Sequence, residues 1–291
     1  MRKTLDVLFI IFQYLVPQHL LSRLVGKIAD CEWPWVKNNF ITWFIGRYQV
    51  DMQEALDSEP FNYPNFNAFF TRELQPGVRP VADAADAIAS PADGAISQLG
   101  DIEEGRIFQA KGQDYSLTEL LGGDEELAQP FQGGRFATIY LSPRDYHRVH
   151  MPLAGKLKTM VYVPGDLFSV NNTTAENVPR LFSRNERAVC LFETDAGPMA
   201  MVLVGAMIVA GIETVWAGQV APIKREIRTH HYLQRRRTIN LKKGDEMGRF
   251  KLGSTVVLLF GPDVMDWLGN YMAGTPTRMG EALGTLRSTD D

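Results

Sequence analysis

The chain has 291 residues, of which 30 are lysine or arginine and 34 are aspartate or glutamate, so its formal net charge is −4, and 45% of its residues are hydrophobic. This composition predicts a globular protein with a substantial core, excludes collagen-like and disordered chains, and argues against nucleic acid as the main partner. The two cysteines, Cys31 and Cys190, are far apart, which excludes a disulfide framework and a cysteine zinc site and indicates a reducing compartment.

The first 60 residues predict amphipathic helices. Apolar residues recur at helical spacing from Leu5 to Val16, and the pattern resumes after Pro17 and continues to Ile28. The first apolar run is too short to cross a hydrocarbon core, and no small-residue cleavage site follows it. We therefore expect two helices separated at Pro17, and neither a membrane span nor a secretory signal peptide.

Aromatic residues follow these helices in a basic setting. Trp33, Trp35 and Trp43 lie among Lys37 and Arg47, and residues 1–50 carry six basic and three acidic side chains. Tryptophan beside lysine and arginine is typical of segments at the lipid headgroup boundary. A second interpretation is that the helices cover the core of the main domain, and opposite faces allow both.

From Ile88 onward the sequence predicts a mainly β domain over residues 61–291. Short β-rich runs alternate with glycine, proline and aspartate. The fold class expected is therefore α+β, a β-rich sandwich-like core with N-terminal helices. Ser116 and Glu119 form a capping box that opens a short helix, which ends at Gly122. The expected strands are 87–98, 106–110, 136–142, 156–163, 188–193, 199–213 and 255–260.

One segment of this domain is strongly basic. Residues 224–243 carry eight lysines and arginines against the single acid Glu226. The segment is expected to be a surface loop or hairpin. It is either solvated or in contact with anionic lipid.

Two motifs combine reactive side chains with turn-forming neighbours. Asp93 lies in the turn Ser90–Gly94, a common structural pattern. His147 and His150 follow a predicted strand, three residues apart. They would serve as a general base or as a metal pair, but Asp93 is the only evident further ligand, so no metal is expected.

A third motif, Leu252-Gly253-Ser254-Thr255, precedes the last predicted strand. Glycine adopts strained backbone angles readily, and the Ser254 hydroxyl lies within five-membered-ring reach of the Gly253 carbonyl, so the serine can attack its own preceding peptide bond. That reaction needs a base and a carboxylate to orient the base. His150 and Asp93 supply both types if the fold brings them together.

Five motifs follow one another along the chain: Pro91-Ala92-Asp93-Gly94, the Tyr-His-Arg-Val-His run that ends at His150, residues 182–187, residues 213–218 and Leu252-Gly253-Ser254-Thr255. In this order they resemble the bacterial phosphatidylserine decarboxylase family. The resemblance spans residues 63–261, about two thirds of the chain, and the arm before residue 60 matches only in kind.

The resemblance implies a proenzyme that cuts itself between Gly253 and Ser254 into a β chain, 1–253, and an α chain, 254–291. His150, oriented by Asp93, would remove the Ser254 proton, and Ser254 would become a covalent pyruvoyl group. This cofactor would form a Schiff base with phosphatidylserine and release CO2 and phosphatidylethanolamine. His147 would contact the substrate or return the proton, with Tyr140 as a weaker candidate.

The resemblance also implies partners and a location. The α and β chains would remain together as a heterodimer, with further dimerisation left open. A diacyl substrate implies peripheral attachment to the cytoplasmic face of the bacterial inner membrane. Deletion of residues 1–50 is expected to release the protein from membranes and to leave self-cleavage intact.

Two other functions remain open from the residues alone. A serine hydrolase would use Asp93, His150 and Ser254 on an external ester or amide without cutting itself, although the G-x-S-x-G elbow is absent around Ser254. A non-catalytic membrane-binding or carrier domain would use Gly253-Ser254 only as a turn.

Overall fold

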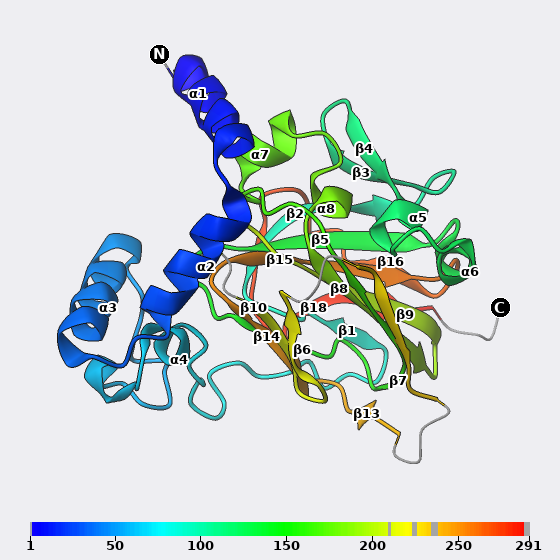
Figure 1. Ribbon diagram of the computed structural model, residues 1–291. Helices are drawn as coiled ribbons and strands as arrows, with labels where there is room; N and C mark the ends of the chain where they lie inside the picture. Colours follow the sequence, from blue (N-terminus) through cyan, green and yellow to red (C-terminus); the bar gives the residue numbers. More distant parts are fainter. Residues whose placement is uncertain (1, 209–210, 223–225, 234–237, 288–291) are drawn as a thin grey trace.

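The structure, a computed structural model, describes residues 2–208, 211–222, 226–233 and 238–287 (Figure 1). The N-terminal arm lies along one side of a β-rich body, on the side opposite the C-terminus. The predicted α+β class is confirmed. The arm, residues 1–60, contains the helices α1 (Arg2–Leu15), α2 (Gln18–Ala29) and α3 (Pro34–Tyr48), and the short turn η1 (Pro60–Asn62) and the helix α4 (Phe66–Phe70) follow it.

The predicted break at Pro17 is confirmed, because α1 ends at Leu15 and α2 begins at Gln18. No single helix in the described part of the chain is long and apolar enough to cross a membrane. By length and composition alone, α1 and α2 pass such a test together, but they are bent by 89° at the break. Proline favours a break here because it lacks the amide hydrogen that a continuous helix requires.

A large antiparallel sheet forms the centre of the body. Its strands run in the order β12-β7-β8-β9-β15-β5-β2-β17, and β13 also pairs with β7. The sheet has β15 in its middle, paired with β9 on one side and β5 on the other. The bounds are β2 (Gly94–Asp101), β5 (Arg135–Leu141), β7 (Gly155–Val163), β8 (Arg187–Thr194), β9 (Gly197–Val204), β12 (Arg228–His231), β13 (Asn240–Leu241), β15 (Ser254–Phe260) and β17 (Pro276–Thr277).

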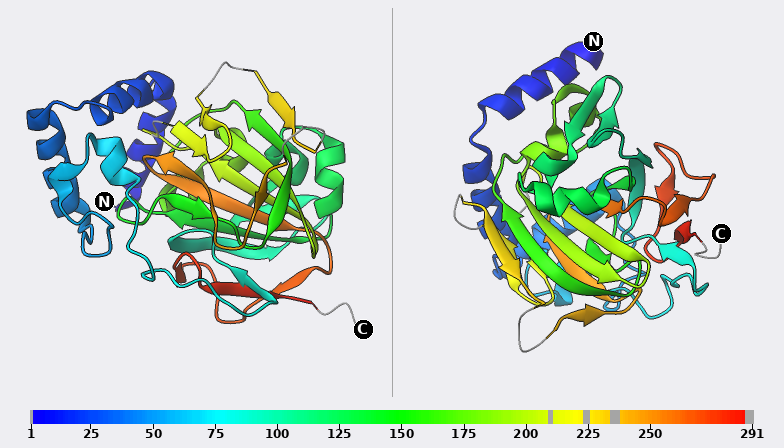
Figure 2. Two further views of the ribbon diagram at one scale, coloured as in Figure 1. Left: turned by 90° about the horizontal axis from the view of Figure 1, so that it is seen from below. Right: turned by 90° about the vertical axis from the view of Figure 1, so that its right-hand side faces the viewer.

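Two smaller sheets cover one face of the large sheet, and short helices with a hairpin cover the other (Figures 1 and 2). The small sheets are β11-β10-β14-β6 and β1-β18-β16, built from β1 (Ala87–Ala89), β6 (Arg148–His150), β10 (Gly211–Thr214), β11 (Gly218–Ala221), β14 (Glu246–Lys251), β16 (Met265–Trp267) and β18 (Ala282–Leu286). The opposite cover comprises β3 (Arg106–Ala110), β4 (Gln113–Ser116), α5 (Leu117–Leu120), α6 (Glu125–Ala128), η2 (Gln129–Phe131), α7 (Asn172–Asn177) and α8 (Leu181–Arg184).

Alternation along β15 shows how one strand serves both cores. Val256, Leu258 and Phe260 belong to the core beneath the small sheets, whereas Val257 and Leu259 belong to the core beneath the helices. Successive side chains of a strand point to opposite faces, so a continuous apolar run is required where both faces are buried.

Most expected strands are found within a residue or two of their predicted ends, but two are divided. Residues 87–98 form β1 and β2, separated by the turn that contains Asp93. The expected strand 199–213 was wrong as one element, because β9 ends at Val204 and β10 begins at Gly211 in another sheet. The Gly205 amide donates to the Glu186 carbonyl at 2.8 Å, outside the ladder between β8 and β9.

Two local predictions concern polar segments. Ser116 accepts a hydrogen bond from the Glu119 amide at 3.3 Å, which confirms the cap of α5. In the basic segment, β12 and β13 form antiparallel pairs with β7. Lys224, Arg225 and residues 235–237 of that segment lie outside the described residues.

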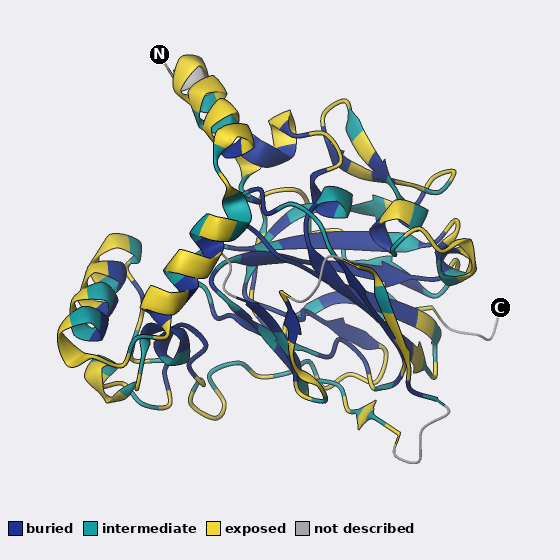
Figure 3. Ribbon diagram, viewed as in Figure 1, coloured by how far each residue is buried: buried dark blue, intermediate teal, exposed yellow. Residues whose placement is uncertain are grey.

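The arm has a buried side and an exposed side (Figure 3). We call its buried side the arm cluster, which consists of Ala29, Ile41, Phe44, Val50, Phe66, Phe69, Phe70 and Leu252. Its exposed side carries large apolar residues of all three long helices, and we call this the apolar face: Leu5, Leu8, Ile11, Phe12, Leu15, Leu20, Leu24, Ile28, Trp33, Trp35 and Trp43. The buried side fits the interpretation that the helices cover part of the main domain, and lipid contact on the exposed side stays a prediction.

Candidate active site

The segment that ends in Ser254 has an unusual backbone. Leu252 and Gly253 both have positive φ, 74° and 60°. Glycine tolerates this region, but a leucine held there costs about 1–3 kcal/mol, which the surrounding structure must offset. An added Cβ on Gly253 would meet no atom within 4 Å, so glycine is required here by its conformation and not by lack of space.

Ser254 begins the central strand and is completely buried. It pairs with Leu141 of β5, and its side chain shares a face with Val256, toward the core beneath the small sheets. Its Oγ has no hydrogen-bond partner among the described residues. Other buried hydroxyls share this state, among them those of Thr214 and Thr255, so it is the position of Ser254 after the strained turn that distinguishes its Oγ.

His147 is another buried residue of this region with an atom that lacks a partner among the described residues. Its Nδ1 donates to the Asp145 carbonyl at 2.7 Å, because a carbonyl oxygen only accepts, and so Nε2 carries the lone pair. Nε2 is buried and has no partner in the described part of the chain. Burial lowers the pKa of His147 to about 3, so the imidazole is neutral at pH 7. The ring packs on Phe70 of α4, with centroids 4.0 Å apart.

His150 has both ring nitrogens occupied. Nδ1 donates to the Gly244 carbonyl at 2.8 Å, so Nε2 accepts from the Tyr146 hydroxyl at 3.1 Å. Burial lowers the pKa of His150, and nearby Glu246 opposes that effect. His150 is therefore a neutral base. Its Nε2 can accept a proton, but it is already occupied by the hydrogen bond from the Tyr146 hydroxyl.

The carboxylate of Asp93 is hydrogen-bonded to Arg79 and not to a histidine. Its carboxylate accepts from Arg79 Nε at 2.9 Å and Arg79 Nη2 at 2.7 Å, and from the Met279 amide at 2.8 Å. Arg79 also pairs with Glu54 at 2.6 Å. Gly94 is needed after Asp93 because a Cβ there would overlap the Tyr140 carbonyl oxygen of β5.

The fold brings some of the expected site residues together. The His150 amide donates to the Pro91 carbonyl at 2.8 Å, which places the Asp93 turn beside β6. The Phe250 amide donates to the His147 carbonyl at 3.0 Å, four residues before Ser254. Hydrogen bonds between Asp93 and His150 and between His150 and Ser254 are absent from the described structure. The functional roles of these groups therefore remain predictions.

Tyr140 lies on the other face of the sheet from Ser254. It shares the face of β5 that belongs to the core beneath the helices, whereas Leu141, the partner of Ser254, belongs to the opposite core. Tyr140 lines a cavity of about 1280 Å3 together with Ser142 and Arg144. Burial raises the pKa of its hydroxyl.

Three polar residues of this region could not be assigned from the sequence alone. Arg79 has no local signal, because it lies 14 residues before Asp93. Tyr146 and Arg148 lie within the histidine motif. Arg148 donates to the Thr71 carbonyl and to Glu246, both at 2.9 Å. Val149, between Arg148 and His150, lies in the core. Strand alternation could therefore have indicated from the sequence that Arg148 and His150 share the opposite face.

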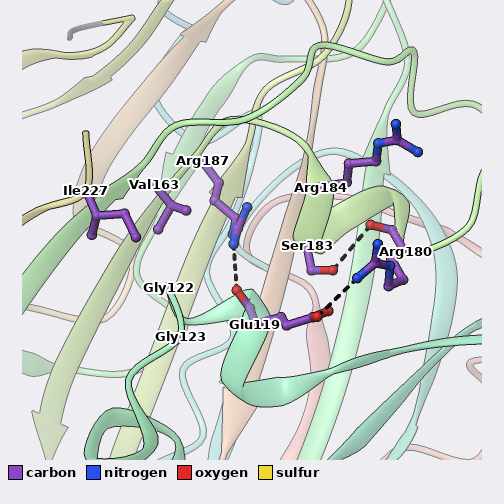
Figure 4. A pocket seen from close by; sticks show the side chains of 9 residues that line it. All are labelled: Glu119, Gly122, Gly123, Val163, Arg180, Ser183, Arg184, Arg187 and Ile227. Carbon is purple, nitrogen blue, oxygen red and sulfur yellow. Dashed lines mark hydrogen bonds and ion pairs between the residues drawn. The ribbon is translucent and has the colours of Figure 1, made fainter. Parts of the chain in front are cut away.

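The motif at residues 182–187 has a structural role (Figure 4). Arg187 is buried and donates to the carbonyls of Leu120 and Glu119 at 2.7 and 2.6 Å, which caps the end of α5. Burial lowers the pKa of Arg187 to about 10. Ser183, Arg184 and Arg187 of this motif line a pocket of about 310 Å3, in which Arg180 also pairs with Glu119.

Across all described residues, no three histidine, cysteine, aspartate or glutamate side chains form a possible metal site.

Comparisons with known proteins agree over nearly the whole chain. A family model described as phosphatidylserine decarboxylase matches residues 66–285, and a model described as PSD matches residues 8–49. Three similar relatives are each named phosphatidylserine decarboxylase proenzyme. The Pseudomonas paraeruginosa relative is 66% identical over 96% of this chain and 96% of its own. The Pseudomonas entomophila relative is 65% identical over 95% and 96%, and the Stutzerimonas stutzeri relative 63% identical over 98% and 96%.

Proposed function

This chain belongs to the phosphatidylserine decarboxylase family, and we propose that it converts phosphatidylserine to phosphatidylethanolamine and CO2 through a pyruvoyl group made from its own Ser254. It is a lyase of phospholipid synthesis. The observation that carries the site assignment is the pair of positive φ angles at Leu252 and Gly253, directly before a buried Ser254 Oγ without a partner.

Self-cleavage in this proposal uses atoms of the chain and one water molecule. Ser254 Oγ attacks the Gly253 carbonyl carbon, the peptide C–N bond breaks, and an ester forms. Loss of the Ser254 Cα proton then breaks the Cβ–O bond and leaves a carboxylate on Gly253. The resulting enamine becomes an imine, and water converts it to a ketone with loss of ammonia. The products are a β chain, 1–253, and an α chain, 254–291, which stay together as a heterodimer.

Residues around Ser254 fit a group formed at this position. The pairing of Thr255 with Tyr140 and with Val204 would hold the new terminus at the centre of the sheet. The pyruvoyl ketone would supply the electron acceptor for the electron pair that remains when the bond to CO2 breaks. His147 Nε2, neutral and unpartnered, is able to hold or return a proton there. Tyr140 is the weaker candidate for contact with the substrate, because its side chain lies on the opposite face of the sheet from Ser254.

His150 is the proposed base for self-cleavage, with Asp93 as the carboxylate that supports it. Its Nε2 carries no proton, so it can accept one once the Tyr146 hydroxyl moves away. Asp93 lies in the turn whose Pro91 carbonyl accepts a hydrogen bond from the His150 amide. It therefore helps to place His150 through the backbone, and its negative charge acts on the His150 imidazole without a direct contact.

This role predicts the pH dependence of self-cleavage. Burial lowers the pKa of His150 below its ordinary 6.5, so the base stays unprotonated as the pH falls through 6.5. The cleavage rate should therefore be level from neutral pH to below 6.5 and fall only at lower pH, where the lowered pKa is crossed. A pulse-labelled chain from cell-free synthesis, chased at each pH, measures this rate. A rate already halved at pH 6.5 or above would contradict the assignment.

We further propose that residues 1–60 form a membrane-associating arm on a decarboxylase domain of residues 61–291. The apolar face is exposed on all three long helices, and α2 and α3 each carry a basic residue in the last turn, Lys27 and Arg47. Such a face suits the headgroup boundary of an anionic bilayer, which here is the cytoplasmic side of the inner membrane. Peripheral binding there would bring the enzyme to a diacyl substrate.

Loss of two exposed tryptophans tests the arm. Replacing Trp35 and Trp43 with serine should lower partitioning onto vesicles that contain phosphatidylserine by about tenfold or more, because the apolar contact of both indole rings with the bilayer would be lost. Sedimentation of the protein with vesicles measures this. The control is Met272→Ser, an equally exposed apolar residue outside the arm. Equal partitioning of the double variant and the parent would rule out this face.

A further inference from the structure

Leu252 links the arm to the segment that is cut. Every other buried member of the arm cluster in the described structure comes from residues 29–70, and so do Phe40, Tyr48 and Tyr63, which pack against it. Leu252 is 4% exposed and enters this cluster from the opposite end of the sequence. The residue two positions before Ser254 is therefore packed against the arm.

The Gly253–Ser254 bond is held from both sides. Leu252 is fixed by the arm cluster, in a backbone conformation that leucine adopts only under constraint. Ser254 is fixed by its pairing with Leu141 in the central sheet. Gly253 between them has open space where a Cβ would lie. The packing of Leu252 is therefore one of the contacts that hold a turn with two consecutive positive φ angles.

The arm cluster also supports the nearby histidine. His147 packs on Phe70, and Phe70 and Phe44 lie with ring centroids 5.7 Å apart in that cluster. One set of aromatic rings thus contacts both the segment before Ser254 and the ring that carries the unpartnered Nε2.

We infer that the arm cluster positions the Gly253–Ser254 bond for self-cleavage, with Leu252 and Phe44 as positioning residues. The inference rests on the proposed self-cleavage at that bond. It gives the arm a second role beside membrane contact. It also argues against the expectation that deletion of residues 1–50 leaves self-cleavage intact, because that deletion removes Ala29, Ile41, Phe44 and Val50 from the arm cluster.

The test compares self-cleavage rates of variant chains made by cell-free synthesis in detergent. Leu252→Ala should slow cleavage by about 10- to 100-fold, because a small displacement of reacting atoms has effects of this size. Leu252→Met, which refills the volume, should restore the rate to within about threefold of the parent. Leu252→Met as slow as Leu252→Ala would overturn the inference.

A matched truncation separates positioning from stability. Leu120→Ala removes the same atoms from another fully buried leucine, which packs in the core beneath the helices. It should lower thermal stability comparably and leave the cleavage rate within about twofold of the parent. Equal slowing by Leu120→Ala, or no slowing by Leu252→Ala, would refute the role of Leu252.

If Leu252→Ala fails to fold, Phe44→Leu decides, since it keeps most of the apolar volume on the arm side. Cleavage of Phe44→Leu should slow about threefold or more. A rate equal to that of the parent would overturn the inference. Failure of the unmodified chain to cut itself would instead refute the proposed function, so the two failures are distinguishable.

Discussion

Replacement of Ser254 with alanine is expected to leave one uncut chain of 32.7 kDa without decarboxylase activity. Alanine has no nucleophile to attack the Gly253 carbonyl and no oxygen to eliminate. No ketone can then form at position 254, and the loss of activity should be complete within the limits of the assay. Intact mass and CO2 release from phosphatidylserine vesicles measure both effects.

Thr255 supplies the control for this experiment. It is the next residue, it is completely buried, and its hydroxyl also has no partner among the residues that the structure describes, but it occupies the other face of β15. Thr255→Val removes that hydroxyl and keeps the volume, so self-cleavage should proceed as in the parent. Cleavage of Ser254→Ala at the same bond would disprove the role of Ser254.

The second large effect should separate the two histidines. His150→Gln should remain uncut, because it lacks the base for the Ser254 proton. His147→Gln should cut itself but lose about 10²- to 10⁴-fold in decarboxylation, the usual contribution of a positioned proton donor or acceptor. Denaturing electrophoresis reports cleavage, and CO2 release per mole of α chain reports the second reaction.

The opposite result would exchange the two roles. If His147→Gln stays uncut and His150→Gln cuts itself normally, His147 is the base for self-cleavage. In that case its Nε2, buried and unpartnered like Ser254 Oγ, receives the proton. The contacts of His150 with Gly244 and Tyr146 would then be structural.

The fold was largely predictable where local pattern determines structure. The helical periodicity and Pro17 predicted α1 and α2, and the capping box at Ser116 predicted α5. Apolar runs located most strands. The exceptions were residues 87–98, which the Asp93 turn divides, and residues 199–213, where an uncharged run up to Ile212 conceals a change of sheet between Val204 and Gly211.

Contacts between distant segments were not predictable. The sequence supplied Asp93 and His150 as a pair, but Arg79 competes for the carboxylate and Gly244 for the imidazole, and neither has a local signature. Strand alternation could have separated Leu141 from Tyr140, but not shown which face holds Ser254. The packing of Leu252 in the arm cluster joins the segment before Ser254 to residues 29–70, which no pattern of spacing reveals.

Intact-mass measurement of the purified, active protein tests the central claim most directly. Two chains are expected, residues 1–253 and residues 254–291, the smaller lighter by one ammonia than the unmodified peptide and reactive toward a hydrazide at its first residue. A single unmodified species of 32.7 kDa in fully active protein would contradict the account.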